Sequence, residues 1–442
     1  MRQEKTRRWL VIVLILVLLA VIAALGYGFW SKMQAESNLP VLDDDSAMTE
    51  QVQDPDGEDT TVVDDPVVDV PPVDDPVVDE PPVDEPEVPV KTFDTAGLGT
   101  IETGGFDLSD EHIQLMYDFM TAWYQPLISL GEVNMSGLFS REVQSDSHAD
   151  ALRTLILIRQ RSLTDLRMKN LSYVLTVTDV EWEDGRLRVE ADENTVMNFM
   201  ATPDTDSILY DLPHIFIFDD SGERLKLHHH EADDNPYFSY RRAENSDYDD
   251  GIDIILRSIE DHQSQRGVYS PVTWYTADHP YDRGAALDYL YEYCGKRNSK
   301  WYAYDAVGGN CMNFGSQVLL AGGIPEDEQG SAQWYWDDQY DLALSWINVG
   351  RFYEYCRDNY GYGLVADTEA GYYTGEVGDV LIVGYDDEHR HTTIISDIVY
   401  DENGEAVDYL ISCNTTNYRD FPVSAYYYTF HRLIKIIGWN EG

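Results

Sequence analysis

Cysteine is scarce in this sequence, and its pattern excludes several classes of protein. The 442 residues hold four cysteines: Cys294, Cys311, Cys356 and Cys413. They form no CxxC pair of the kind that binds zinc and no dense framework of the kind that disulfides hold together. A disulfide-scaffold protein and a cysteine-ligated metal protein are therefore excluded. We expect no metal and no cofactor. One disulfide bridge between two of the three cysteines other than Cys311 remains an alternative.

Positive charge is also scarce. The chain carries 81 acidic and 30 basic residues, which gives a formal net charge of -51 at pH 7. A protein that binds nucleic acid needs a basic patch or stripe to neutralise phosphates, and this sequence has none. Nucleic acid is therefore excluded as a partner.

The longest hydrophobic run lies at the N-terminus. Residues 9–30 contain no charged side chain, and the run is long enough to cross a bilayer as a helix. The basic residues of segment 1–8 predict a cytoplasmic tail. We therefore expect one span in the lipid bilayer of the cell membrane, with all folded domains extracellular. A cleaved signal peptide is the alternative.

A proline-rich acidic segment follows the hydrophobic run. Residues 31–100 hold 20 acidic residues, two lysines and 10 of the chain's 18 prolines. Proline restricts the backbone and like charges repel, so we expect an extended, disordered linker. In polyproline II geometry it would reach on the order of 200 Å, which suits a spacer within a cell wall. The alternative is a solubilising tail without a length requirement.

Residues 101–242 show the patterns of an α+β domain. Ser109 is placed to cap a helix with apolar residues at three- and four-residue steps, and a second amphipathic stretch covers residues 149–163. Alternating patterns then predict strands at 173–182, 186–191, 195–200 and 214–218. This order of elements resembles the cone-shaped fold of nuclear transport factor two.

Three consecutive histidines end this domain. Alternate side chains of a strand face opposite ways, so only His228 and His230 of the run could bind one ion, and no spaced third ligand is evident. We therefore expect solvated histidines at a strand end. Residues 243–270 are polar and are interpreted as a connecting segment, with a helix at 252–261.

The last predicted domain, residues 271–442, contains the strongest motif. Gly308 and Gly309 precede Cys311, and the residues after Cys311 predict a helix that ends at the Gly322-Gly323 pair. The thiol would lie at a helix N-terminus, where the partial positive charge favours a nucleophilic thiolate, so we expect a lowered pKa. The N–H of Cys311 would point toward a developing oxyanion.

Two further residues of this domain fit a Cys-His-Asn triad. His391 begins an apolar strand, and a hairpin near Asn403-Gly404 leads to a second strand that ends at Asn414. A two-residue turn pairs His391 with Thr416 and a four-residue turn pairs it with Asn414, and both place Asn414 on the face of His391. The amide could then orient the imidazole. We prefer His391 to His389 because the apolar run starts directly after it.

The motif Asn-Cys-Met-Asn-Phe-Gly-Ser-Gln, with the Ala-Gly-Gly-Ile-Pro that ends at Pro325, resembles the signature of the putative amidase domain family. That family is similar to papain-like amidases and peptidases, including the CHAP amidases. The resemblance implies a nucleophile helix packed on an antiparallel sheet, with Cys311 as nucleophile and His391 as base. Asn310 and Asn414 depart from the family pattern, which usually has an acidic residue and a histidine there. Asn310 and Gln317 are the expected supporting residues beside the nucleophile.

The anchor, the linker and the resemblance together predict a membrane-anchored extracellular cysteine amidase. The expected substrate is an amide or peptide bond of peptidoglycan, because the anchor and linker would hold the domain near the wall. Two alternatives stay open. One is a degenerate wall-binding module of the same fold, and the other is an extracellular cysteine protease.

Overall fold

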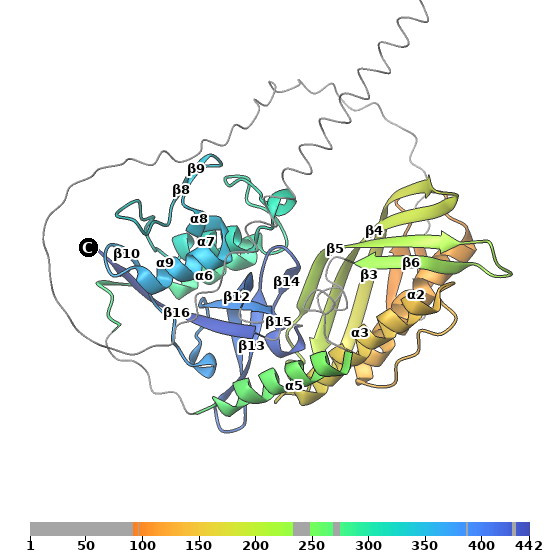
Figure 1. The fold of residues 1–442 in the computed structure, drawn as a ribbon, viewed down its shortest axis with the longest axis horizontal. Coiled ribbons are helices and arrows are strands. Elements are labelled where there is room, and N and C mark those ends of the chain that lie inside the picture. Colours follow the sequence, from red (N-terminus) through yellow and green to blue (C-terminus); the bar gives the residue numbers. More distant parts are fainter. Residues whose placement is uncertain (1–91, 96, 233–247, 268–274, 386–387, 427–429) are drawn as a thin grey trace, which may run out of the picture. The chain divides into compact units, whose positions relative to one another are not determined.

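The computed structural model describes most of the chain after the predicted linker (Figure 1). The described residues are 92–95, 97–232, 248–267, 275–385, 388–426 and 430–442. The predicted anchor at 9–30 and nearly all of the predicted linker lie outside these ranges. Within the ranges, no helix has the length and apolar character needed to cross a membrane. The predicted mixed α+β class is confirmed.

The first sheet is built mainly from consecutive antiparallel strands of the middle of the chain. Strand β2 pairs in parallel with β3, and the other neighbours pair antiparallel. The order is β1-β2-β3-β4-β5-β14, with β6 also paired to β5. The strands are β1 (Thr92–Thr95), β2 (Gly99–Glu102), β3 (Met168–Glu183), β4 (Arg186–Phe199), β5 (Ser207–Asp219), β6 (Lys226–Ala232) and β14 (Asn417–Arg419).

Two long helices, α2 (Asp110–Ser129) and α3 (Glu142–Arg161), run along this sheet (Figure 1). Helix α2 begins as predicted, because the Ser109 side chain accepts a hydrogen bond from the His112 N–H. Buried side chains such as Phe119 and Tyr173 join the helices and the sheet in one core. That core continues into residues of the second sheet, including Tyr409.

The second sheet carries the cysteine motif. Its order is β10-β16-β11-β12-β13-β15, with β7 also paired to β16. The strands are β7 (His279–Pro280), β10 (Gly363–Asp367), β11 (Val380–Tyr385), β12 (Glu388–Tyr400), β13 (Ala406–Ser412), β15 (Phe421–Pro422) and β16 (Phe430–Asn440). The remaining elements are α5 (Tyr248–Ser264), α6 (Arg283–Tyr293), α7 (Cys311–Ala321), α8 (Leu344–Ile347), α9 (Val349–Asp358), the short pair β8 (Trp336–Asp338) and β9 (Asp341–Leu342), and the 3-10 turns Asp305–Val307, Tyr372–Thr374 and Val423–Ala425.

The two faces of the second sheet belong to different cores. Val380 and Ile382 of β11 pack in one core with Cys311 and other residues of α7, whereas Leu381 and Val383 pack in the core shared with the first sheet. Such alternation is expected of a strand that is buried on both sides. We call the side of Val380 and Ile382 the helix face and the side of Leu381 and Val383 the back face.

The strand β14 joins the end of the chain to the first sheet. It pairs with β5, and the buried Ser207 hydroxyl of β5 donates to the Asp420 carbonyl at 2.6 Å. The ring of Phe199 meets that of Phe421 edge to face at 5.7 Å. These contacts lie within a single compact unit. The divisions predicted at residues 243 and 271 stay predictions.

Candidate active site

The thiol of Cys311 lies where the sequence predicted it. Helix α7 begins at Cys311, and Gly308 and Gly309 before it have φ angles of 119° and 105°, which side chains rarely permit. The chain can therefore turn sharply into the helix with its first N–H groups free of intrahelical partners.

The sulfur of Cys311 is buried but surrounded by N–H donors. Burial raises the thiol pKa, because a charged thiolate loses hydration, while hydrogen bonds from the N–H groups of Thr392, Met312 and Cys311 itself act in the opposite direction. The expected lowering of the pKa was wrong. Only 8% of Cys311 is exposed, and desolvation outweighs the helix N-terminus and the donors.

Strand β12 brings Thr392 to the nucleophile helix. Thr392 pairs with Ile382 and therefore lies on the helix face, where its hydroxyl donates to the Met312 sulfur at 3.3 Å. Gly315 makes this close approach possible, because a Cβ there would come within 3.1 Å of the Thr392 methyl carbon. Gly315 thus has a packing role in this chain.

His391 projects from the opposite side of β12. It pairs with Val383, which places it on the back face, and its ring stacks on Tyr426 at a centroid distance of 6.3 Å. The Nε2 atom is buried and has no hydrogen-bond partner among the described residues. Burial lowers the pKa of His391 to about 4, so the imidazole is neutral at neutral pH. The structure therefore brings Cys311 beside the backbone next to His391 but does not join the two side chains.

Asn414 is held on the helix face and does not reach His391. Its Oδ1 accepts from the Gly295 N–H at 3.0 Å, and its Nδ2 donates to the Lys296 carbonyl at 3.2 Å. The predicted Cys-His-Asn triad is thus not assembled in this structure. Asn414 instead fixes the end of β13 to the turn after α6.

A β-bulge explains the difference from the predicted register. Asp397 pairs with Leu410, as a two-residue turn requires, but Ile395 pairs with Ile411 because the register shifts between Ile395 and Asp397. Ile394 then pairs with Ser412, so Asn414, two residues further on, shares the face of Ile394. A one-residue shift moves a strand's side chains to the opposite face.

The two supporting residues are both buried, and neither has a described hydrogen bond to Cys311. Asn310 precedes the helix, where its side-chain oxygen accepts from the Tyr304 N–H at 3.1 Å and from Asn313 at 2.8 Å. Gln317 accepts from the Tyr289 hydroxyl at 2.8 Å and thereby ties α7 to α6. Both side chains hold the helix in place.

Sequence reasoning missed the loop after Asn414. Thr415 and Thr416 have φ angles of 63° and 51°, which are strained for β-branched residues. The Thr415 hydroxyl accepts from the Asn310 N–H at 2.6 Å and donates to Asp305 at 3.2 Å. Asn417 accepts from the Thr415 N–H at 3.0 Å. A pair of threonines gives no sequence signal for such a conformation, because threonine ordinarily favours strands.

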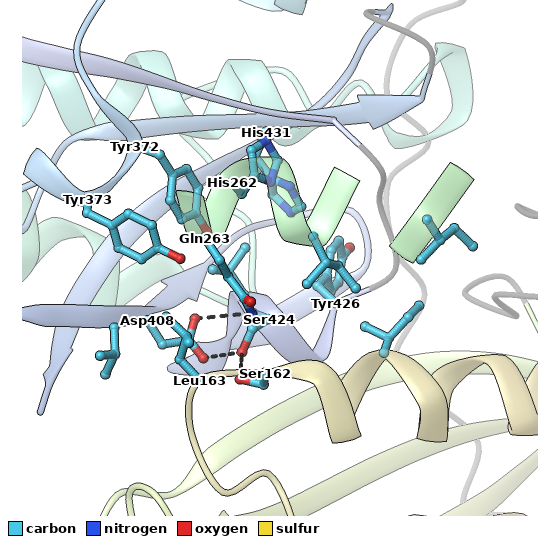
Figure 2. Close-up of a pocket in the computed structure, with 15 residues that line it drawn as sticks. Ser162, Leu163, His262, Gln263, Tyr372, Tyr373, Asp408, Ser424, Tyr426 and His431 are labelled. Atoms are coloured by element: carbon cyan, nitrogen blue, oxygen red, sulfur yellow. Dashed lines mark hydrogen bonds between the residues drawn. The ribbon is translucent and has the colours of Figure 1, made fainter. Parts of the chain in front are cut away.

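A cavity on the back face was also missed (Figure 2). Asp408 accepts from the Ser424 hydroxyl, which is 2.9 Å from the hydroxyl of Ser162, the residue directly after α3. Burial raises the pKa of Asp408 to about 6, although the donors around it act in the opposite direction. His262 and His431 also line the cavity, with their rings 5.0 Å apart. Among the described residues, no group of three or more His, Cys, Asp or Glu side chains is placed to hold a metal ion.

Comparison with known proteins identifies one part of the chain. Neither the curated proteins nor the solved structures contain a match. Residues 280–437, which include Cys311, His391 and Asn414, match the model of the family described as the putative amidase domain. This match confirms the family predicted from the cysteine motif and assigns the C-terminal part of the chain to an amidase-type hydrolase.

Proposed function

We propose that the chain is a membrane-anchored extracellular cysteine amidase that hydrolyses amide or peptide bonds of peptidoglycan. The observation that carries this proposal is the position of the buried Cys311 at the start of α7, where backbone N–H groups act against the rise of the thiol pKa, in a domain that matches an amidase family. The helix on an antiparallel sheet supports the papain-like fold that the motif implies, and the two long helices along the first sheet support the cone-like domain.

In this mechanism the Cys311 sulfur attacks the carbonyl carbon of the substrate amide. The carbonyl oxygen becomes an oxyanion, which the N–H of Cys311 at the helix N-terminus stabilises. The amine leaves with a proton, and a thioester to Cys311 remains. Water then hydrolyses the thioester and regenerates the thiol.

His391 serves as the general base that removes the thiol proton and returns it to the leaving amine. A base must be neutral to accept a proton, and burial keeps His391 neutral. Its Nε2 has no hydrogen-bond partner in the described part of the chain, and the backbone N–H of the next residue, Thr392, acts on the Cys311 thiol. A change of side-chain rotamer alone leaves His391 on the back face, so completing the pair requires a shift of β12 that turns His391 to the helix face when substrate binds.

Asn414 contributes through position and not as the third triad residue. Its amide binds the turn after α6 on both sides, so it holds the loop that carries Thr415 against Asn310. The predicted anchor and linker support the extracellular location and the wall substrate, because they would tether the hydrolase to the membrane and extend it outward.

A wall-binding module without catalysis is a second candidate. The raised pKa of Cys311 and the back-face position of His391 favour it, because a protonated thiol without a base does not attack amides. An extracellular protease would use the same residues on protein substrates.

Digestion assays separate these functions. Wild type, Cys311→Ala and Cys356→Ala would be incubated with purified cell wall and with casein, and released amines would be quantified. We expect wall-derived amines from wild type and from Cys356→Ala, whose cysteine is buried in a different helix, α9, and none from Cys311→Ala. Wall binding without release by wild type would establish the binding module, and release from casein alone would establish the protease.

A further inference from the structure

The core of the first sheet contains a continuous chain of buried histidines. His148 of α3 binds His230 of β6 (Nε2 to Nδ1, 3.1 Å), and His230 binds His214 of β5 (Nε2 to Nδ1, 3.0 Å). His214 continues to Glu193 of β4 (Nε2 to Oε2, 2.8 Å). All four side chains are buried, so water does not substitute for these partners. His230 is thus not the solvated histidine that the sequence predicted.

The position of each proton in this row of histidines follows from the contact of His148 with Gln144. The Nδ1 of His148 lies 2.8 Å from the Gln144 carbonyl, which only accepts, so Nδ1 carries the proton. In a neutral His148, Nε2 is then an acceptor, and His230 must donate from Nδ1. By the same reasoning, His214 donates from Nδ1 to Nε2 of His230.

The last contact then lacks a proton. With its single proton on Nδ1, a neutral His214 presents a lone pair at Nε2 to the carboxylate oxygen of Glu193. Two acceptors 2.8 Å apart in a buried site would repel each other. One additional proton resolves the conflict, either on Nε2 of His214 or on Glu193. Glu193 also accepts from the hydroxyls of Tyr124 and Thr195, which stabilises its ionised form.

We propose that the folded domain holds one proton in the His214–Glu193 pair that the unfolded chain releases, so that the domain loses stability as pH rises above neutral. The site is a pH-sensitive device that is distinct from the nucleophile at Cys311. Strand β5 carries His214 and also pairs with β14, next to the loop that contacts Asn310. The device therefore lies on a strand that supports the candidate active site.

Few other titratable or charged groups of the described residues interact with the hydrogen-bonded histidines and Glu193. Tyr124 of α2 faces Glu193, and burial raises the tyrosine pKa well above 10, so it stays a donor. Arg159 of α3 acts on Tyr124, His229 of β6 acts on His148 and His230, and Asp192 of β4 acts on His214. Burial raises the pKa of Glu193, but the hydrogen bonds and charge of His214 and the two hydroxyls lower it overall, in agreement with an ionised Glu193.

The sign of the pH effect follows from proton counting. An unfolded histidine releases its proton near pH 6.5, whereas the folded pair retains one. The folded state therefore binds one proton more above about pH 6.5, and the stabilisation is lost as pH rises. His148 and His230 behave in the opposite way, because burial lowers their pKa values, so their contribution is lost as pH falls below about 6.5.

The variant Glu193→Gln tests the proposal in the full chain. A glutamine amide can donate to Nε2 of a neutral His214, while its oxygen still accepts from Tyr124 and Thr195. Every hydrogen bond between the histidines and residue 193 is then formed without the extra proton. Between pH 7 and 9 the unfolding equilibrium constant of wild type should rise about tenfold per pH unit relative to that of Glu193→Gln. Glu190→Gln, on a half-exposed carboxylate of the same strand, is the matched control and should follow wild type.

A second measurement does not depend on the variant. Nitrogen-15 NMR of the wild-type full chain, labelled at histidine, should show His148 and His230 neutral with the proton on Nδ1 from pH 6.5 to 8. Parallel stability profiles of wild type and Glu193→Gln would overturn the proposal. Protons on Nε2 of His148 or His230 would overturn it as well.

Discussion

The Oγ1 atom of Thr415 lies 2.6 Å from the backbone nitrogen of Asn310, the residue directly before Cys311, and accepts its N–H. Thr415 adopts a left-handed conformation that costs a non-glycine residue on the order of 1–3 kcal/mol. The hydrogen bonds with Asn310, Asp305 and Asn417 offset this cost. The strained loop and the start of helix α7 thus depend on one another.

Thr415→Val should therefore weaken the site. The substitution keeps the branched shape but leaves the Asn310 N–H without an acceptor, which costs about 1–3 kcal/mol at a buried position. Urea unfolding of the full chain should show this loss, and turnover should fall. Thr415→Ser, which keeps the hydroxyl, is the control and should retain activity. Equal stability of Thr415→Val and Thr415→Ser would contradict a role for this hydrogen bond.

The cysteines should differ in their reaction with iodoacetamide. Only thiolates react, and N–H donors favour the thiolate of Cys311, whereas burial raises the pKa of Cys294 to about 12 and that of Cys356 well above 9. Peptide-resolved alkylation of the native protein should label Cys311 before these two. Its rate should rise about tenfold per pH unit below its raised pKa. Rapid labelling at pH 6.5 that does not change with pH would show that the thiol is already ionised.

The loss of activity on the acid side of the pH profile should occur only at low pH. The profile of kcat/KM reports groups of the free enzyme, and a general base works only when neutral. Because burial holds the pKa of His391 at about 4, activity should persist as pH falls and decline only near pH 4. The profile would be measured on wall substrate, with circular dichroism as the control for unfolding. A decline near pH 6.5 that His391→Ala does not share would instead indicate a solvated His391 in the free enzyme.

Local features of this chain were predictable from sequence, because they depend on neighbouring residues. Ser109 caps α2 through a contact three residues away, and the glycines before Cys311 permit the start of α7. The family match rests on the same local motif. These features locate the proposed nucleophile, Cys311, without knowledge of the rest of the fold.

The register of β12 and the contacts of Asn414 were not predictable in this way. The bulge between Ile395 and Asp397 shifts the pairing by one residue, and the residue types at that point do not predict a bulge. The pairing of β14 with β5 and the burial of His230 join segments far apart in the chain. Such contacts depend on tertiary packing, which hydrophobic periodicity does not report.

The most direct test of the central claim is capture of the thioester at Cys311. Wild type turning over purified cell wall would be quenched in acid, digested and analysed by mass spectrometry, with Cys311→Ser and Cys356→Ser treated alike. We expect a wall-derived acyl group on the peptide that contains Cys311 in wild type and in Cys356→Ser, and neither acyl group nor thiol-dependent amine release in Cys311→Ser. Amine release at the wild-type rate by Cys311→Ser would contradict Cys311 as the nucleophile.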